Sequence, residues 1–320
     1  MKKKLLWGAL YVLVFALSFV GAIAVTVLMS QNFAGIENAS WTASMGTIER
    51  DIPYAHGALN KFDLYLPADR ARATELVVYI HAGGFTGGDK ADDAHMGKFF
   101  AAKGYVAATI NYSLRAKTNR VTIIQMSREI HQGVSAIVAA AVERGYHLHG
   151  MVIAGGSAGG TLAMIYAYRD AANAPIPVKA VINMVGPASF EPALWFGFRD
   201  GYASDKTARA GAAFVSILTG DAVSPQMMRS GAYRNLLKPI TPTALVTPSA
   251  PPTLIAYGAL DKVAPFAASV GLLDALRSNH VPYDALVFPN SGHGLNRDPE
   301  MAAELGKEIN EYLNRYAPLH

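Results

Sequence analysis

The sequence predicts an α/β protein with a mostly parallel central sheet and helices on both faces, preceded by an N-terminal transmembrane helix. Three observations favour this class. Short apolar runs alternate with stretches of helix length, several of these runs end in glycine-rich turns, and a long uncharged apolar segment stands at the N-terminus. A chain of 320 residues is long enough for one large domain with an appendage.

Residues 1–29 predict a signal anchor. Lysines occupy positions 2–4, and residues 5–29 carry no charged side chain. A membrane span needs about 20 apolar residues, whereas the apolar region of a cleavable signal has about 7–15, so the length favours an uncleaved anchor. A buried core helix is the alternative. Because the lysines are expected to stay in the cytoplasm, we expect a single-pass cell-membrane protein with its main domain outside, or a secreted protein if the segment is cleaved. Residues 30–47 are polar and small, and we expect them to form a tether.

Residues 48–320 have the pattern of one folded domain. Residues 61–67 alternate apolar and polar side chains, as a half-buried strand does. Residues 75–80 form a near-continuous apolar run, which indicates a strand buried on both faces. Further strands are expected at 105–111, 151–155, 178–185, 252–257 and 283–288, and helices at 91–103, 121–144, 161–168, 264–278 and 299–316.

The segment at about 188–251 breaks this alternation. Its first part is rich in aromatic residues, and its last part is rich in proline. We therefore expect it to be an insertion that lies over the ends of the strands.

Composition excludes several classes of function. The formal charge of +4 includes the three N-terminal lysines, which leaves +1 for the rest of the chain, so no basic face for a nucleic acid is expected. Cysteine is absent from the sequence, which excludes disulfides, thiol catalysis and thiolate metal sites.

The stretch from Met151 to Gly160 (MVIAGGSAGG) carries the clearest chemical signal. A short apolar run leads into Gly155-Gly-Ser157-Ala-Gly159, and a good helix-forming stretch follows. Strand, glycine-flanked serine and helix is the order that a nucleophile elbow needs, because the tight turn leaves no room for side chains beside the serine. A strand–helix turn of small residues without chemistry is the alternative, so the serine needs partners elsewhere in the chain.

A serine hydroxyl becomes a nucleophile when a base takes its proton and an acid orients that base. Both partners should follow strands downstream of the serine, in the order Ser, Asp, His, because ligands gather at the carboxyl ends of parallel strands. Asp261 follows the strand at 252–257, and His293 follows the last strand between two glycines. Asp261 has an alternative role as the cap of the next helix. The sequence therefore predicts Ser157, Asp261 and His293 as catalytic residues.

Acyl transfer also needs backbone donors aimed at the oxyanion that develops. His81-Ala82-Gly83-Gly84 follows an early strand, and its glycines leave their N–H groups unobstructed. The N–H of Ala158, directly after the serine, is a further donor. We therefore predict Gly83, Gly84 and Ala158 as an oxyanion hole, with His81 as a structural brace for the loop.

With these motifs the chain resembles α/β-hydrolase-fold esterases of the hormone-sensitive-lipase and acetyl-esterase (BD-FAE-like) type. The resemblance covers about residue 62 to the C-terminus. Two details depart from the usual pattern: His81-Ala82-Gly83-Gly84 stands for His-Gly-Gly-Gly, and Asp261-Lys-Val-Ala-Pro265 stands for Asp-x-x-Val-Pro. The segments that carry the resemblance are 78–90, 111–115, 155–160, 258–261 and 292–293.

The motifs and the resemblance imply a serine carboxylic-ester hydrolase that acts through an acyl-enzyme on small esters with short acyl groups, without a metal or an organic cofactor. Phe85, Phe190, Trp195 and Phe196 are expected to line its substrate pocket, and a cap packed on itself is the alternative for the aromatic insertion. An acyltransferase, a serine peptidase of the prolyl-oligopeptidase type and a catalytically silent surface binding module remain alternative functions. The sequence leaves the oligomeric state open.

Overall fold

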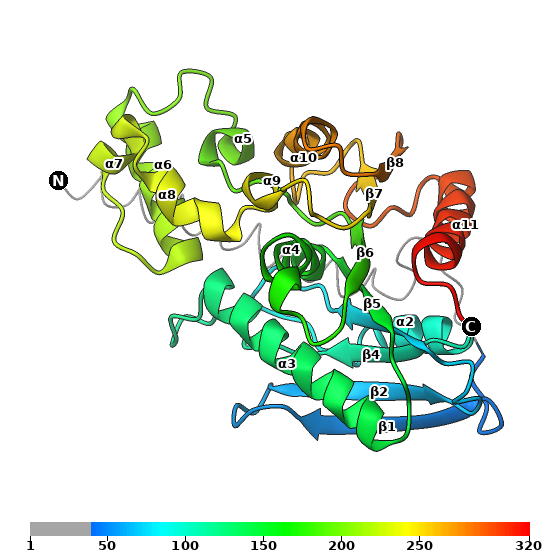
Figure 1. The fold of residues 1–320 in the computed structure, drawn as a ribbon. Coiled ribbons are helices and arrows are strands. Elements are labelled where there is room, and N and C mark those ends of the chain that lie inside the picture. The colour runs from blue at the N-terminus through cyan, green and yellow to red at the C-terminus, as the bar shows by residue number, and fades with distance from the viewer. Residues whose placement is uncertain (1–39) are drawn as a thin grey trace.

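The computed structural model describes residues 40–320, in which helices cover both faces of one sheet (Figure 1). The strands of this part lie in the order β1-β2-β4-β3-β5-β6-β7-β8. Their bounds are β1 (Gly46–Pro53), β2 (Lys61–Pro67), β3 (Glu75–Ile80), β4 (Val106–Ile110), β5 (Gly150–Gly156), β6 (Val178–Met184), β7 (Thr253–Gly258) and β8 (Tyr283–Phe288). The α-helices are α2 (Ala94–Ala101), α3 (Ile123–Glu143), α4 (Ala158–Ile165), α5 (Pro192–Phe196), α6 (Asp205–Thr219), α7 (Pro225–Ser230), α8 (Tyr233–Leu237), α9 (Pro242–Leu245), α10 (Ala267–Ser278) and α11 (Pro299–Tyr316).

The sheet of residues 40–320 is mixed, and five of its seven strand pairs are parallel, in line with the mostly parallel sheet predicted from the sequence. β1 pairs antiparallel with β2, and β2 pairs antiparallel with β4, whereas the remaining pairs are parallel. The sequence analysis missed β1, because its residues are exposed or half-buried and contain no apolar run. An edge strand in an antiparallel pair can face solvent, so it needs no such run.

The structure also corrects the prediction of a transmembrane helix. No helix within residues 40–320 is long and apolar enough to cross a membrane. The long helices α3 and α11 both carry charged residues. The prediction rested on the apolar run at 5–29 and on the lysines before it, and the predicted anchor at 1–29 lies outside the described residues. The fold class that the structure supports is an α/β fold with a mixed sheet.

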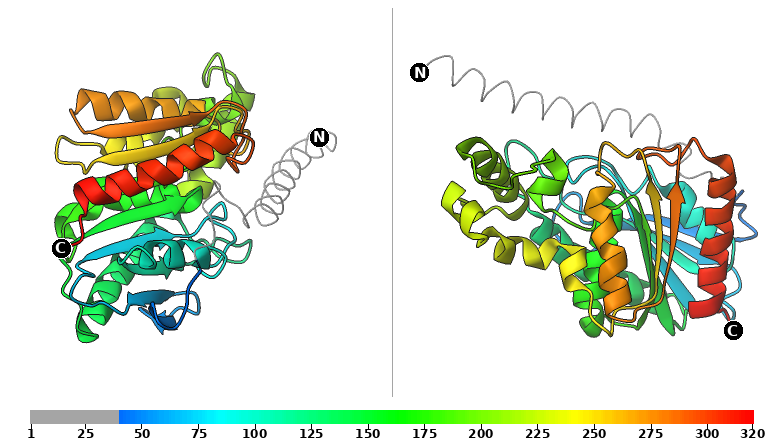
Figure 2. Two further views of the ribbon diagram at one scale, coloured as in Figure 1. Left: turned by 90° about the vertical axis from the view of Figure 1, so that its right-hand side faces the viewer. Right: turned by 90° about the horizontal axis from the view of Figure 1, so that it is seen from above.

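Helical glycines let the helices pack closely on the two faces of the sheet. α2 places Gly97 against the ring of Tyr65, and α3 places Gly133 against the side chain of Ile110. Tyr65 and Ile110 point to opposite faces, because Ile110 pairs with Phe62 and side chains alternate along β2. α2 and α11 cover one face, whereas α3, α4 and α10 cover the other (Figure 2).

Between β6 and β7 the chain adds α5 to α9, of which all but α6 are short, at the left and top of Figure 1. Two of them begin at serine caps: the hydroxyl of Ser204 accepts the N–H of Thr207, and the hydroxyl of Ser224 accepts the N–H of Met227. This stretch coincides with the segment that the sequence analysis treats as an insertion, although no helices were expected in it.

The parallel strands place their carboxyl ends along one edge of the sheet. β3, β5 and β7 are buried over their whole lengths, so they form the rigid centre of the domain. Ser157 follows β5, and the loops that carry Asp261 and His293 follow β7 and β8. The fold therefore directs all three segments to the same edge.

The close approach of α2 to the sheet predicts opposite effects for two helical glycines. A methyl group on Gly97 would overlap the buried ring of Tyr65, whereas one on Gly306 in α11 meets nothing beyond its own helix within 4 Å. We expect Gly97→Ala to lower the free energy of unfolding by about 1–3 kcal/mol. Gly306→Ala, the matched control, should raise it by about 0.5–1 kcal/mol. Urea unfolding followed by circular dichroism measures both, and equal effects would contradict the packing described.

Candidate active site

Ser157 occupies the turn between β5 and α4 in a strained backbone conformation. Its φ and ψ angles are 51° and −119°, which residues with a side chain rarely adopt. Its N–H donates to the carbonyl oxygen of Met184 at 2.8 Å, and its carbonyl oxygen accepts the N–H of Thr161 at 3.1 Å. These bonds to the end of β6 and to α4 hold the strained residue in place.

Close contacts require the glycines on both sides of this serine. A Cβ atom on Gly155 would overlap the backbone of Gly159, and a Cβ atom on Gly159 would overlap the carbonyl oxygen of Ile80. The turn is therefore pressed against the end of β3, the strand from which the glycine-rich loop departs. For this reason Ser157 and the loop are neighbours.

His293 joins the serine and the aspartate in one chain of hydrogen bonds. Its Nε2 lies 2.7 Å from Ser157 Oγ, and its Nδ1 lies 2.6 Å from Asp261 Oδ2. Because an ionised carboxylate accepts hydrogen bonds and cannot donate them, we assign the ring proton to Nδ1, which leaves Nε2 of the neutral ring to accept from the serine hydroxyl. All three residues are buried. The structure thus brings together the three side chains that the sequence predicted.

Asp261 uses its two carboxylate oxygens for different partners. Oδ2 faces His293, whereas Oδ1 accepts the N–H groups of Val263 at 2.8 Å and Ala264 at 3.0 Å. The capping role considered for Asp261 is therefore real, but it serves a turn before α10. The N-terminus of α10 itself begins after Phe266 without a side-chain cap. The bonds at Oδ1 fix the carboxylate so that Oδ2 stays directed at the histidine.

The loops that carry the acid and the histidine are fastened to each other. The N–H of Leu260 donates to the carbonyl oxygen of Ser291 at 3.0 Å. Asp298 closes the histidine loop, because its carboxylate accepts the Ser291 hydroxyl at 2.6 Å and the Asn290 side-chain amide at 2.8 Å. Burial raises the pKa of Asp298, but these hydrogen bonds outweigh burial, and the pKa lies below its usual value. Asp298 therefore remains an acceptor at neutral pH.

The loop after β3 presents backbone N–H groups that have no acceptor. Gly83 and Gly84 adopt φ angles of 126° and 59°. Within residues 40–320, the N–H groups of Gly83, Gly84 and Ala158 donate no hydrogen bond. The N–H of Ala158 also belongs to the first turn of α4, where the helix dipole favours negative charge. These three groups are the donors that the sequence predicted for an oxyanion.

His81 braces the start of this loop, in agreement with the sequence analysis. Its ring stacks on Tyr112 with centroids 4.3 Å apart, and its Nδ1 donates to the carbonyl oxygen of Ala82, 2.5 Å away. Burial lowers the pKa of His81, which keeps the ring neutral. His81 is therefore bound to the backbone of the loop and does not serve as a second base.

The far end of the same loop is held by ion pairs. Lys90 Nζ lies 2.8 Å from a carboxylate oxygen of Asp63 and 3.0 Å from one of Asp51, and the Lys90 N–H donates to Asn111 Oδ1 at 2.5 Å. Burial lowers the pKa of Lys90, but the two carboxylates outweigh burial and raise it, so the side chain stays charged. These contacts tie the loop to β1, β2 and the end of β4.

The four aromatic residues predicted to line a pocket belong to one continuous row of rings. Phe85 meets Phe190 edge to face, and Phe190 stacks on Trp195, each with 6.1 Å between centroids. Phe214 joins Trp195 to Phe196, with its centroid 5.5 Å and 5.2 Å from theirs. Phe190 is fully buried, whereas 37% of Phe196 is exposed. The row connects the loop after β3 to α5 and α6.

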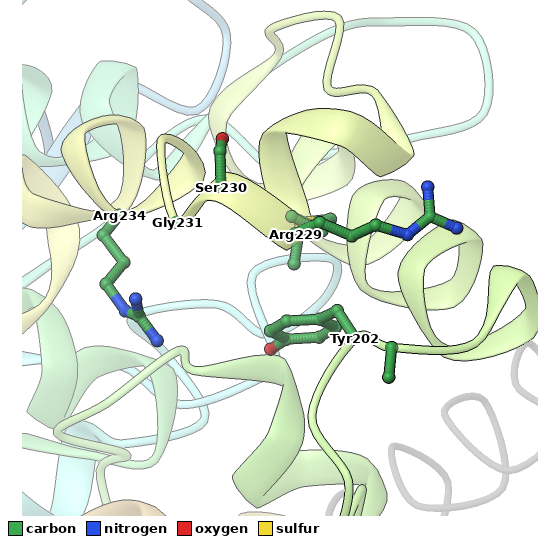
Figure 3. A pocket seen from close by; sticks show the side chains of 7 residues that line it. Tyr202, Arg229, Ser230, Gly231 and Arg234 are labelled. Atoms are coloured by element: carbon green, nitrogen blue, oxygen red, sulfur yellow. The ribbon is translucent and has the colours of Figure 1, made fainter.

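A separate pocket of about 340 Å³ lies among the inserted helices (Figure 3). None of the three residues of the Ser157–His293–Asp261 chain lines it. Glu191 accepts hydrogen bonds from the hydroxyl groups of Tyr202, which lines the pocket, and of Tyr233, and it thereby ties the start of α5 to α8. The residues that line this pocket are Tyr202, Ala203, Met228, Arg229, Ser230, Gly231 and Arg234.

Comparison with known proteins identifies the family. A family model described as BD-FAE matches residues 62–276, which is more than half of the chain. The chain belongs to the BD-FAE family. This match confirms the resemblance that the motifs predicted, and the BD-FAE chain is an α/β-hydrolase.

Curated relatives of the BD-FAE chain are distant. Kynurenine formamidase of Salmo salar is 26% identical over 120 residues, which are 38% of this chain and 38% of that protein. A probable isoprenylcysteine alpha-carbonyl methylesterase of Oryza sativa subsp. japonica is 23% identical over 260 residues, which are 76% of this chain and 56% of that protein. The chain thus spans 38% to 56% of the length of these two relatives.

Solved structures share the fold of the BD-FAE chain. Esterase B of Lactobacillus rhamnosis has a TM-score of 0.67 at 19% identity, over 92% of this chain and 93% of that chain. Esterase Est2 of Thermogutta terrifontis has a TM-score of 0.65 at 19% identity, over 86% and 94% of the two chains. At this level of identity the likeness shows the fold.

Three residues that shape the BD-FAE site were given no role from the sequence: Asp93, Asp298 and Tyr112, which lies in the segment 111–115 that carries the resemblance. Asp298 precedes Pro299, so it reads as an ordinary helix cap, although no capping bond forms. Asp93 likewise stands directly before a helix. Tyr112 could have been found, because it lies just beyond the carboxyl end of β4, at the edge of the sheet where ligands gather.

The strained φ angle of Ser157 predicts that this residue lowers the stability of the BD-FAE chain. Glycine tolerates this conformation, whereas alanine keeps the strain of about 1–3 kcal/mol. We expect Ser157→Gly to unfold with a free energy about 1 kcal/mol higher than Ser157→Ala, after allowing for the greater backbone entropy of glycine in the unfolded chain. Urea denaturation of the two variants measures the difference. A glycine variant less stable than the alanine variant would contradict the strained turn.

Proposed function

We propose that this protein is a serine carboxylic-ester hydrolase. The observation that carries the proposal is the hydrogen-bond chain from Ser157 Oγ through His293 to Asp261 Oδ2, with both bonds shorter than 2.8 Å. A nucleophile, a base within hydrogen-bond reach and an acid that orients the base are the groups that acyl transfer requires. Membership of the BD-FAE family supports the same proposal.

In the proposed acylation step, Ser157 Oγ attacks the ester carbonyl carbon while His293 Nε2 takes the serine proton. Asp261 holds the ring in the required tautomer and stabilises the imidazolium that forms. The N–H groups of Gly83, Gly84 and Ala158 stabilise the oxyanion, and they face it without prior reorganisation because no other acceptor in residues 40–320 occupies them. His293 then protonates the leaving alcohol, and an acyl-enzyme remains.

In the deacylation step, water replaces the alcohol. His293 Nε2 takes a proton from the water as the oxygen attacks the acyl carbonyl, the same N–H groups stabilise the second oxyanion, and the proton returns to Ser157 Oγ as the acid leaves. An acyltransferase would use the same residues with an acceptor alcohol in place of water. The outcome therefore depends on which nucleophile reaches the acyl-enzyme.

We further propose that the acyl group is short. The row of rings begins at Phe85, directly after the loop glycines, and its second ring, Phe190, is fully buried between Phe85 and Trp195. A wall so close to the proposed oxyanion donors leaves little depth for a long chain. The relatives named above include an esterase, a methylesterase and a formamidase, so a formyl amide belongs among the compounds to be tested.

Hydrolysis of a p-nitrophenyl ester series, from acetate to palmitate, tests the proposal directly. We expect activity on the short esters, and we expect Ser157→Ala to lower kcat by about 10,000-fold or more because the nucleophile is lost. An N-formyl anilide in the same series tests amide cleavage, and a fluorophosphonate probe tests the nucleophile independently of the acyl group. A folded protein that reacts with none of these compounds would refute the enzyme and leave the silent binding module. Labelling without hydrolysis would favour the transferase or the peptidase.

The position of Trp195 predicts how the chain-length profile changes. Truncation of its ring removes the support of Phe190 and opens space in the row, so Trp195→Ala should raise kcat/KM on octanoate relative to acetate by about 10-fold, as expected for added apolar contact. The control is Leu194→Ala, because Leu194 stands on the same helix and is 39% exposed. An unchanged profile in the tryptophan variant would place the acyl group elsewhere.

A further inference from the structure

A buried carboxyl group lies directly behind the loop that carries the proposed oxyanion donors. Asp93 stands before the first residue of α2, and 6% of it is exposed. Its side chain makes no capping bond to α2, which is the usual role of an aspartate at this position. Instead, its Oδ2 accepts the N–H of Ala82, at 3.4 Å. The carboxyl group is therefore directed away from its own helix and toward the loop.

Two successive peptide groups of the loop form hydrogen bonds with side chains. The carbonyl oxygen of the His81–Ala82 peptide accepts the Tyr112 hydroxyl at 3.1 Å, and the N–H of the same peptide donates to Asp93. The carbonyl oxygen of the next peptide, Ala82–Gly83, accepts His81 Nδ1–H. The N–H of that second peptide belongs to Gly83 and is a proposed oxyanion donor. Rotation of the first peptide would therefore redirect the second.

We propose that Asp93 is a positioning residue that sets the direction of the Gly83 N–H by holding the Ala82 N–H from behind. This inference rests on the function proposed above. The peptide between His81 and Ala82 is hydrogen-bonded at both ends, to the Tyr112 hydroxyl through its carbonyl oxygen and to the Asp93 carboxyl through its N–H. Each of these two hydrogen bonds polarises the peptide and so strengthens the other. The loop is thereby fixed before a substrate arrives, which is the condition under which oxyanion donors lower the barrier most.

The charge of Asp93 bears on the same donors. The titratable groups that interact with it are Asp92 on the same segment, Tyr79 on β3 and Tyr112 after β4. Burial, and after it the charge of Asp92, raise the pKa of Asp93 to about 7. Below this pH the carboxyl is neutral and its oxygen still accepts the Ala82 N–H. Above it, a buried negative charge stands behind the donors and opposes the negative charge of the oxyanion.

Kinetics of Asp93→Ala and Asp93→Asn on a p-nitrophenyl short-chain ester test the inference. Asp93→Ala removes the acceptor, so we expect kcat to fall by about 10- to 100-fold with KM changed by less than about two-fold, because the donors act in the transition state. Asp93→Asn keeps an acceptor oxygen without a titratable proton, so it should restore kcat. Asp274→Asn is the control, since Asp274 is an exposed carboxylate on α10, and it should behave as the wild type.

The pH profile separates positioning from a general effect on folding. We expect kcat of the wild type to decline above about pH 7 as Asp93 ionises, and kcat of Asp93→Asn to stay level there. The profile of Asp93→Asn decides the question even if Asp93→Ala does not fold. Full activity of a folded Asp93→Ala, or identical profiles of wild type and Asp93→Asn, would overturn the inference. A wild type that is inert to all esters and to the fluorophosphonate probe would instead refute the proposed function, and the inference with it.

Discussion

The contact between the serine turn and the end of β3 sets the geometry of the whole site. Gly159 lies so close to the carbonyl oxygen of Ile80 that no side chain fits between them. Because the glycine-rich loop leaves β3 at this point, the contact determines where Gly83 and Gly84 lie relative to Ser157. The relative position of the nucleophile and the proposed oxyanion donors thus depends on packing between two rigid elements, a buried strand and the first turn of α4.

Two carboxylates beside the proposed nucleophile and base are held by partners that take no part in the proposed chemistry. One carboxylate oxygen of Asp261 accepts backbone N–H groups of its own turn. Asp298 accepts the hydroxyl of Ser291 and so holds the loop of His293. Buried polar groups are costly unless they are paired, and here most partners come from the same loop or the one beside it. The loops of Asp261 and His293 are therefore ordered largely by their own hydrogen bonds, which fix the directions of these two side chains.

The sequence predicted the elements that have a regular apolar pattern and the residues that have a fixed place in strand order. β2, β3 and β8 have the predicted bounds, and Ser157, Asp261 and His293 meet as their order implied. β1 was missed because an exposed edge strand needs no apolar run. Four of the five inserted helices have only four to six residues, too few to show a helical period in the sequence. Asp93 could not be found, because its partner is the backbone of a loop eleven residues earlier. The transmembrane prediction rested on the apolar run at 5–29 and on the lysines before it, which lie outside the described residues.

The place where the inserted helices leave the sheet divides the site in two. β6 and β7 are neighbours in the sheet, and α5 to α9 connect them. The loop of the proposed oxyanion donors and Ser157 belong to the side of β3 and β5, whereas Asp261 and His293 belong to the side of β7 and β8. The hydrogen bond between His293 and Ser157 crosses the boundary. The inserted helices bridge the same boundary, since α5 and α9 contact α10 while Arg115 donates to the carbonyl oxygen of Ile217 in α6. A displacement of these helices would therefore act on both halves at once and would change the distance between His293 Nε2 and Ser157 Oγ.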